Sequence, residues 1–214
     1  MYLKDKKAVI FDMDGVIIDT EVIWKQAEKE VFSSLGVNVI EEYAKETQSM
    51  ITSEVTQFWY KKFPWSNIGL REAEQMVVSR VVELIKSKDC LIHGVKTFME
   101  RLKSKNYKIG LATNSPFTII PVVLGKLEIA HLFDAISSAE FEVKGKPDPA
   151  IYYTTARKLA IDPKYCLVIE DSYSGILAAK KAGMSVAFFT NGNKKLHFEI
   201  ADYRIDSFNM MELI

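Results

Sequence analysis

The feature that most constrains the fold is an alternation of short apolar runs with helical patterns. Five runs rich in β-branched and aromatic residues are typical of buried strands. Helical patterns, in which apolar residues recur every three or four positions, lie between them. Alternating strands and helices form parallel sheets covered by helices on both faces, so an α/β fold is predicted. The predicted strands are residues 8–11, 108–112, 133–137, 166–169 and 186–189.

One long segment interrupts this alternation. Residues 19–88 contain helical patterns only, with no strand-like run among them. A helical block inserted after the first strand predicts a small second domain that is connected twice to the core. We therefore expect a core domain built from residues 1–18 and 89–214, and a helical cap domain of residues 19–88. The stripes that predict its helices include Trp24, Ala27, Val31 and Leu35, and then Leu70, Ala73, Val77, Val81 and Leu84.

Composition excludes several classes of protein. The 214 residues include 28 Lys and Arg against 28 Asp and Glu, and this balance argues against a nucleic-acid partner. No apolar run is long enough for a membrane span, and the first strand begins too early for a signal peptide to precede it. Cys90 and Cys166 form no C-x-x-C motif, so neither a disulfide framework nor a zinc site is expected. We expect a monomeric cytoplasmic protein without nucleic-acid or membrane partners.

Polar side chains follow three of the predicted strands at the point where each strand ends. In an open parallel sheet, ligands bind beyond the carboxyl ends of the strands, so these side chains are expected to converge. A lysine in the sequence "KGKPDP" joins them from a long connection. The candidates are Asp12 and Asp14 after the first strand, Thr113 and Asn114 after the second, Lys146, and Glu170 and Asp171 after the fourth.

This set of residue types points to phosphoryl chemistry. Clustered carboxylates repel one another, and a hard divalent cation such as Mg²⁺ is the usual compensation. Lys146, Thr113 and Asn114 would supply charge and hydrogen-bond donors for a phosphate group. Asp12 would attack as a nucleophile, and Asp14 would act as the acid and base. Taken alone, the D-x-D pattern is weak, because most such pairs lie in solvated turns.

Four segments together resemble the motifs of the haloacid dehalogenase superfamily: "FDMDGVIIDTE", "LATNS", "GKPDP" and "VIEDSYSGILAAKKAGM". The resemblance spans nearly the whole chain. In detail the chain is most similar to the β-phosphoglucomutase-like group and its sugar-phosphate phosphatases. The stretch "FWYKKFPW" resembles part of the hexitol and 2-deoxyglucose phosphate phosphatases. The resemblance implies a Rossmann-like parallel sheet core with an inserted helical cap domain.

The resemblance also implies roles for individual residues. Asp12 is the implied nucleophile and Asp14 the implied acid and base. Thr113, Asn114 and Lys146 are the implied phosphate ligands. The implied magnesium ligands are Asp12, the carbonyl of Asp14, Asp171 and Glu170.

Two positions depart from the family pattern. The mutases carry a histidine where this chain has Trp24, and the group often has an arginine where our alignment places Ile51. A missing arginine leaves open whether the substrate differs from the usual hexose phosphates or a lysine replaces it. The lysines available for that role are Lys45, Lys61 and Lys62.

The function predicted from the sequence is Mg²⁺-dependent hydrolysis of a small phosphorylated metabolite, a sugar or polyol phosphate, through an aspartyl-phosphate. A phosphosugar mutase is the first alternative, and Trp24 argues against it. A non-catalytic phospho-acceptor module is a second alternative, although such modules lack the helical insert. Dehalogenases and phosphonate-cleaving members lack a second acid in the first motif, so Asp14 argues against both.

Overall fold

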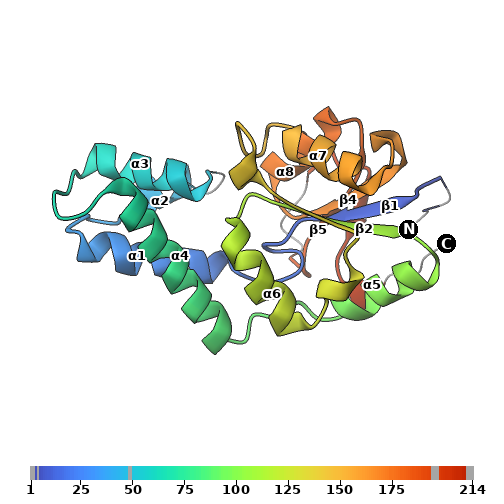
Figure 1. Ribbon diagram of the computed structural model, residues 1–214, viewed down its shortest axis with the longest axis horizontal. Helices are drawn as coiled ribbons and strands as arrows, with labels where there is room; N and C mark the ends of the chain where they lie inside the picture. Colours follow the sequence, from blue (N-terminus) through green and yellow to red (C-terminus); the bar gives the residue numbers. More distant parts are fainter. Residues whose placement is uncertain (1–2, 4, 48–49, 194–197, 211–214) are drawn as a thin grey trace.

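A six-stranded parallel sheet forms the centre of the molecule (Figure 1). The computed structural model describes residues 3, 5–47, 50–193 and 198–210. The strand order is β3-β2-β1-β4-β5-β6, so β1 lies inside the sheet between β2 and β4. The strands are β1 (Ala8–Phe11), β2 (Lys108–Thr113), β3 (Ala135–Ser138), β4 (Cys166–Glu170), β5 (Ser185–Phe189) and β6 (Tyr203–Ile205).

All five predicted strands are confirmed, with ends that differ by at most two residues. The sixth, β6, was missed because it is three residues long and offers no apolar run. Only Ile205 is buried in it, whereas Arg204 is exposed. A strand this short at the edge of a sheet carries little periodic signal.

Side chains of β1 alternate between two buried faces of the sheet, as strand geometry requires. Val9 and Phe11 belong to one apolar cluster, which includes residues of α5 and α6. Ala8 and Ile10 belong to a second cluster, which includes residues of α7 and α8. The two helix pairs therefore lie on opposite faces (Figure 1). These helices are α5 (Val95–Ser104), α6 (Ile120–Leu127), α7 (Ala150–Leu159) and α8 (Tyr173–Lys181).

The segment between β1 and α5 contains helices and no strand among its described residues. It forms a helical layer to one side of the sheet (Figure 1). Phe32 packs against both Trp59 and Trp65, with ring centroids 6.1 and 6.0 Å apart, and so joins the first helix to the third and its following loop. The domain limits 1–18, 19–88 and 89–214 stay a prediction. The helices are α1 (Glu21–Ser34), α2 (Glu41–Glu46), α3 (Thr52–Lys62) and α4 (Leu70–Ser87).

The chain enters and leaves this helical layer at one place. Ile18 and Leu91 form an antiparallel bridge, and the amide of Asp19 donates to the carbonyl of Cys90 at 2.9 Å. The Lys126 ammonium on α6 donates to the carbonyls of Ile85 and Lys88 at 2.8 and 2.7 Å, at the end of α4. These bonds fix the helical layer beside the carboxyl end of β1. In the described part of the chain, no helix is both long and apolar enough to cross a membrane.

Asp134 ties the start of β2 to the start of β3 and gives the first prediction. Its carboxylate accepts hydrogen bonds from the Ile109 amide at 2.8 Å and from Lys103 at 2.9 Å. Burial opposes ionisation of Asp134, but the hydrogen bonds from Lys103, the Ile109 amide and Lys108 outweigh burial. The pKa of Asp134 therefore lies below its usual range. A carboxylate with a lowered pKa stabilises the folded state above its unfolded pKa, and this contribution disappears as pH falls through the folded value.

We therefore expect Asp134→Asn to lower Tm at pH 7 by about 2–4 °C, equivalent to about 1 kcal/mol for a partly exposed charged hydrogen bond. The difference from wild type should shrink as the pH falls below about 4, the ordinary pKa of an aspartate. Thermal melts across pH measure this, with the exposed Asp5→Asn as a control. A difference that is independent of pH would contradict the charge-based explanation.

Candidate active site

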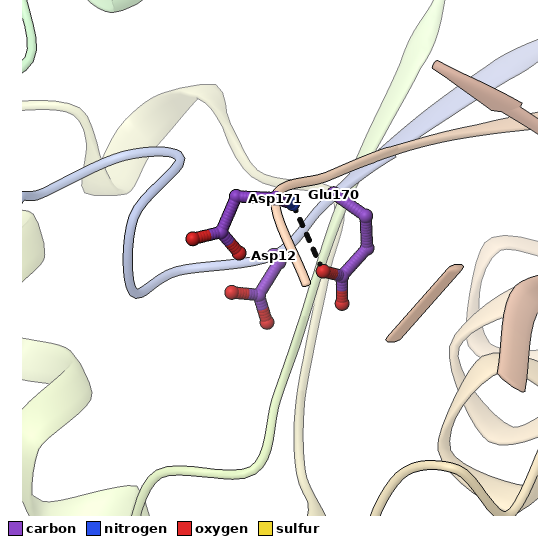
Figure 2. Close-up of side chains that lie close together, drawn as sticks. All are labelled: Asp12, Glu170 and Asp171. Atoms are coloured by element: carbon purple, nitrogen blue, oxygen red, sulfur yellow. Dashed lines mark hydrogen bonds between the residues drawn. The ribbon is translucent and has the colours of Figure 1, made fainter. Parts of the chain in front are cut away.

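The predicted side chains converge at the carboxyl ends of three neighbouring strands. Asp12 follows β1, Thr113 ends β2, and Glu170 ends β4. One carboxylate oxygen from each of Asp12, Glu170 and Asp171 lies within 4.8 Å of the others. Figure 2 shows these three side chains grouped around the end of β4. The pairing of β1 with both β2 and β4 is what brings these distant segments together.

Lys146 is the cation at the centre of this group. Its ammonium donates to Asp12 Oδ1 at 2.5 Å, to Glu170 Oε1 at 2.6 Å and to the carbonyl of Ala112 at 2.9 Å. The residue is buried, and these three bonds use all three donors of the ammonium. Lys146 therefore binds two carboxylates and the main chain of β2 at once.

Glu170 is fully buried, and both of its carboxylate oxygens are occupied by protein donors. Besides Lys146, Oε1 accepts from the Tyr152 hydroxyl at 2.9 Å. Oε2 accepts from the amides of Asp171 and Ser172 at 3.0 and 3.1 Å and from the Ser172 hydroxyl at 3.0 Å. Figure 2 marks the bond from Asp171. This bonding orients Glu170 toward Lys146.

Burial and the neighbouring charges shift the pKa values of three side chains in this group. Burial raises the pKa of Asp12 to about 8, with Glu170 and Asp14 adding to the rise and Lys146 opposing it. Burial also raises the pKa of Asp171 well above its usual range, and Glu170 and Asp12 add to that effect. Burial lowers the pKa of Lys146, but Asp12 and Glu170 outweigh it and raise the value well above normal. One ammonium is thus too little charge for three carboxylates, two of them buried and the third partly buried.

The donor set fits a hard divalent cation. Asp12 Oδ2 and both side-chain oxygens of Asp171 accept no hydrogen bond from any described residue, although both side chains are largely enclosed. Unpaired buried carboxylates are costly, and carboxylate oxygens are the ligands Mg²⁺ prefers. Asp12 and Asp171 therefore have oxygens free for a metal, whereas the oxygens of Glu170 are already bonded within the protein.

Asp14 lies apart from that group and has a different environment. Its Oδ1 accepts from the Thr20 hydroxyl and from Trp24 Nε1, the latter at 3.1 Å. Its Oδ2 accepts from the Ser115 hydroxyl at 2.6 Å and from the Thr113 hydroxyl at 3.3 Å. The end of β2 and the start of α1 thus hold Asp14 in place.

The hydrogen bonds to Asp14 were not predicted from the sequence, although Thr113 was expected at the site. Ser115 follows Thr113 and Asn114 directly, so its position after β2 was the available signal. For Trp24 the signal was its place in the family pattern, where the mutases carry a histidine, because a tryptophan in a helical stripe is otherwise usually a core residue. Thr20 occupies the position before α1 but makes no side-chain capping bond, and its hydroxyl donates to Asp14 instead.

The other predicted phosphate ligands lie at the same edge of the sheet. Asn114 Oδ1 accepts from the amide of Lys146 at 2.9 Å, which attaches the lysine loop to the end of β2. The Asn114 amide nitrogen donates to no described residue and remains available for an anion. Thr113 is directed toward Asp14, as described above.

The helical layer reaches the site through Ile51, where the family pattern suggested an arginine. A β-carbon placed on Gly145 would come within 2.7 Å of Ile51 Cγ2, so the start of α3 rests on the lysine loop. The Lys62 ammonium lies 3.7 Å from the centroid of the Tyr43 ring and 3.6 Å from Glu46 Oε1. The Lys45 side chain lies outside the described residues.

Two glycines allow the carboxylates to approach the backbone. Gly15 has φ +75°, and a β-carbon there would overlap the Asp171 carboxylate. Gly175, in α8, lies directly against Glu170, and a β-carbon there would overlap that carboxylate. Because glycine has no side chain, Gly15 leaves space for the Asp171 carboxylate and Gly175 leaves space for the Glu170 carboxylate.

We expect Gly175→Ala to displace Glu170, release Lys146 from its position and lower Tm by several degrees, because overpacking a buried site costs about 1–3 kcal/mol. Gly125→Ala is the matched control, since that residue is also helical but its β-carbon would meet nothing within 4 Å. Thermal melts of both variants measure the effect. Equal melting temperatures would contradict the close approach at Gly175.

Comparison with known proteins agrees with this geometry. The family model for haloacid dehalogenase-like hydrolases matches residues 6–183. Hexitol phosphatase B of Escherichia coli K12 is 34% identical over 94% of this chain and 91% of its own length. Beta-phosphoglucomutase of Bacillus subtilis is 32% identical over 83% of this chain and 80% of its own. The crystal structure of beta-phosphoglucomutase from Clostridium difficile superposes with a TM-score of 0.83 at 27% identity, covering 97% and 93% of the two chains. The chain belongs to the haloacid dehalogenase-like hydrolases.

Proposed function

We propose that the protein is a Mg²⁺-dependent phosphatase that hydrolyses a small sugar or polyol phosphate through an aspartyl-phosphate on Asp12. We also propose that it acts as a cytoplasmic monomer, without nucleic-acid or membrane partners. The observation that carries the proposal is the separation of the two acids of the first motif. Asp12 is held by Lys146 beside Asp171, whereas Asp14 is held by hydroxyl and indole donors from other segments. The names of the relatives support the substrate class.

Asp12 has the geometry of a nucleophile. Lys146 binds Oδ1, and Oδ2 accepts no hydrogen bond from a described residue. One oxygen of the Asp12 carboxylate would attack phosphorus and form an acyl-phosphate bond while the bond from phosphorus to the leaving oxygen breaks, and the other oxygen would remain available to the metal. The cation of Lys146 would stabilise the charge on the transferring group.

Asp14 would complete both halves of the reaction. Protonated Asp14 would give its proton to the leaving oxygen in the first half. In the second half, the ionised Asp14 would take a proton from the water that attacks phosphorus, which frees phosphate and restores Asp12. The four donors around Asp14 fix the direction of its carboxylate for both transfers.

Magnesium would be held by Asp12 and Asp171, with the carbonyl of Asp14 as a third ligand and Glu170 close by. Bound there, the ion supplies positive charge that compensates the carboxylates and the phosphoryl oxygens. Among the protein groups, Glu170 keeps Lys146 beside Asp12, and the Asn114 amide nitrogen is free to donate to a phosphate oxygen.

A phosphosugar mutase is the second candidate, and it is favoured by the beta-phosphoglucomutase relative. Trp24 weighs against it, because an indole N–H donates but cannot accept a proton. Its bond to Asp14 therefore positions the acid without exchanging protons with it. We expect β-glucose 1-phosphate, given with a catalytic amount of the bisphosphate, to yield free phosphate rather than glucose 6-phosphate. An enzymatic assay for glucose 6-phosphate decides this, and its accumulation would establish the mutase.

Turnover that depends on Asp12 would exclude a non-catalytic phospho-acceptor module. We expect wild-type protein with Mg²⁺ to hydrolyse p-nitrophenyl phosphate and Asp12→Asn to reduce kcat at least about 10³-fold, because the amide is a poor nucleophile. Asp5→Asn, an exposed change of the same kind, should retain wild-type turnover. Stoichiometric phosphorylation without turnover in the wild type would instead support the phospho-acceptor module.

Metal removal tests the cation separately. We expect EDTA to abolish turnover and added Mg²⁺ to restore it. Mg²⁺ should also raise Tm in a concentration-dependent manner, because an ion that binds only the folded state stabilises it. This stabilisation should be weaker in Asp171→Asn. Full activity in the presence of excess EDTA would contradict the assigned metal ligands.

A further inference from the structure

Helix α1 carries a charged residue within its buried face. Residues spaced three and four positions apart form one side of a helix, and here that side faces the interior. All but one of its members are apolar, and the exception is Glu28. The face comprises Ile23, Trp24, Ala27, Glu28, Val31, Phe32 and Leu35.

Glu28 differs from the other glutamates of this helix. Glu21 pairs with Lys25 at 2.5 Å, and Glu30 pairs with Arg80 at 2.6 Å, both on the exposed side. Glu28 is half-buried and makes no hydrogen bond or ion pair with any described residue. Burial alone raises its pKa to about 7. A carboxylate in this position is costly unless hydrogen-bond donors reach it, so it points to a ligand.

The position of Glu28 relative to the catalytic residues is set by Trp24. Trp24 lies one helical turn earlier on the same face, and its indole contacts Asp14 at 3.1 Å. One turn places Glu28 about 6 Å further along the helix. Helix α1 begins beside the sheet and runs away from it (Figure 1). A substrate with phosphorus at Asp12 and its leaving oxygen at Asp14 would extend past Trp24 toward Glu28.

We propose that Glu28 determines specificity by accepting hydrogen bonds from hydroxyl groups of the leaving group. This inference rests on the proposed phosphatase function and names the part of the substrate that the helical layer recognises. Above its raised pKa the Glu28 carboxyl is ionised and only accepts hydrogen bonds, so it selects hydroxyl donors. It also repels a second phosphate or a carboxylate on the leaving group. Ile51, which packs against the lysine loop at the start of α3, offers no cation to offset that repulsion. The site thus selects neutral, hydroxyl-rich leaving groups.

Two substitutions separate recognition from stability. We expect Glu28→Ala to lower kcat/KM for mannitol 1-phosphate, a hexitol phosphate, at least about tenfold relative to kcat/KM for p-nitrophenyl phosphate, which has no hydroxyl groups. We expect Glu28→Gln to raise the rate on fructose 1,6-bisphosphate relative to fructose 1-phosphate severalfold, because the charge is removed while size is kept. Glu21→Gln, an exposed change on the same helix, should alter neither ratio.

A structural role for Glu28 predicts a different result, in which all substrates lose rate in parallel with a fall in Tm. Unchanged ratios in both Glu28 variants would overturn the proposal. Failure of the proposed function is distinguishable, because the wild type would then hydrolyse none of the four phosphate esters. An active wild type with unchanged ratios in the variants overturns only the role of Glu28.

Discussion

The buried ammonium of Lys146, held between Asp12 and Glu170, is the interaction on which the rest of the site depends. Burying one ammonium with two carboxylates is unfavourable unless the geometry and the remaining hydrogen bonds are good. Here Ala112, Tyr152 and Ser172 supply those bonds. Lys146, Asp12 and Glu170 come from three distant segments. Their charges therefore compensate one another only when the sheet has its observed strand order. Loss of Lys146 would leave Asp12 and Glu170 buried without their cation.

The network also places two acids separated by one residue in different environments. Asp12 points into a group that already contains more negative than positive charge, which creates a place for a cation and an anionic substrate. Asp14 points out of that group, toward donors from α1 and from the end of β2. The proposed role of Asp14 as the acid therefore depends on the helical layer, because Trp24 of α1 donates a hydrogen bond to it.

Much of this arrangement was predictable from local patterns. The apolar runs predicted five strands, and polar residues at their ends predicted Asp12, Glu170, Asp171 and Lys146 as neighbours, which the distances confirm. Other features depend on tertiary contacts that leave no local pattern. The indole of Trp24 turns toward Asp14 because of how α1 meets the sheet, and the many partners of Glu170 follow from the packing of α7 and α8 against β4. The three-residue strand β6 and the six-residue helix α2 have too few residues for a periodic signal.

Chemical trapping identifies the residue that carries the phosphoryl group, which we propose is Asp12. Acid quenching during turnover, followed by borohydride reduction, converts an aspartyl-phosphate to homoserine at the modified position. We expect mass spectrometry of peptides to find homoserine at position 12 and nowhere else. Trapping at another carboxylate, or efficient turnover with no trapped species under conditions that preserve acyl-phosphates, would contradict it.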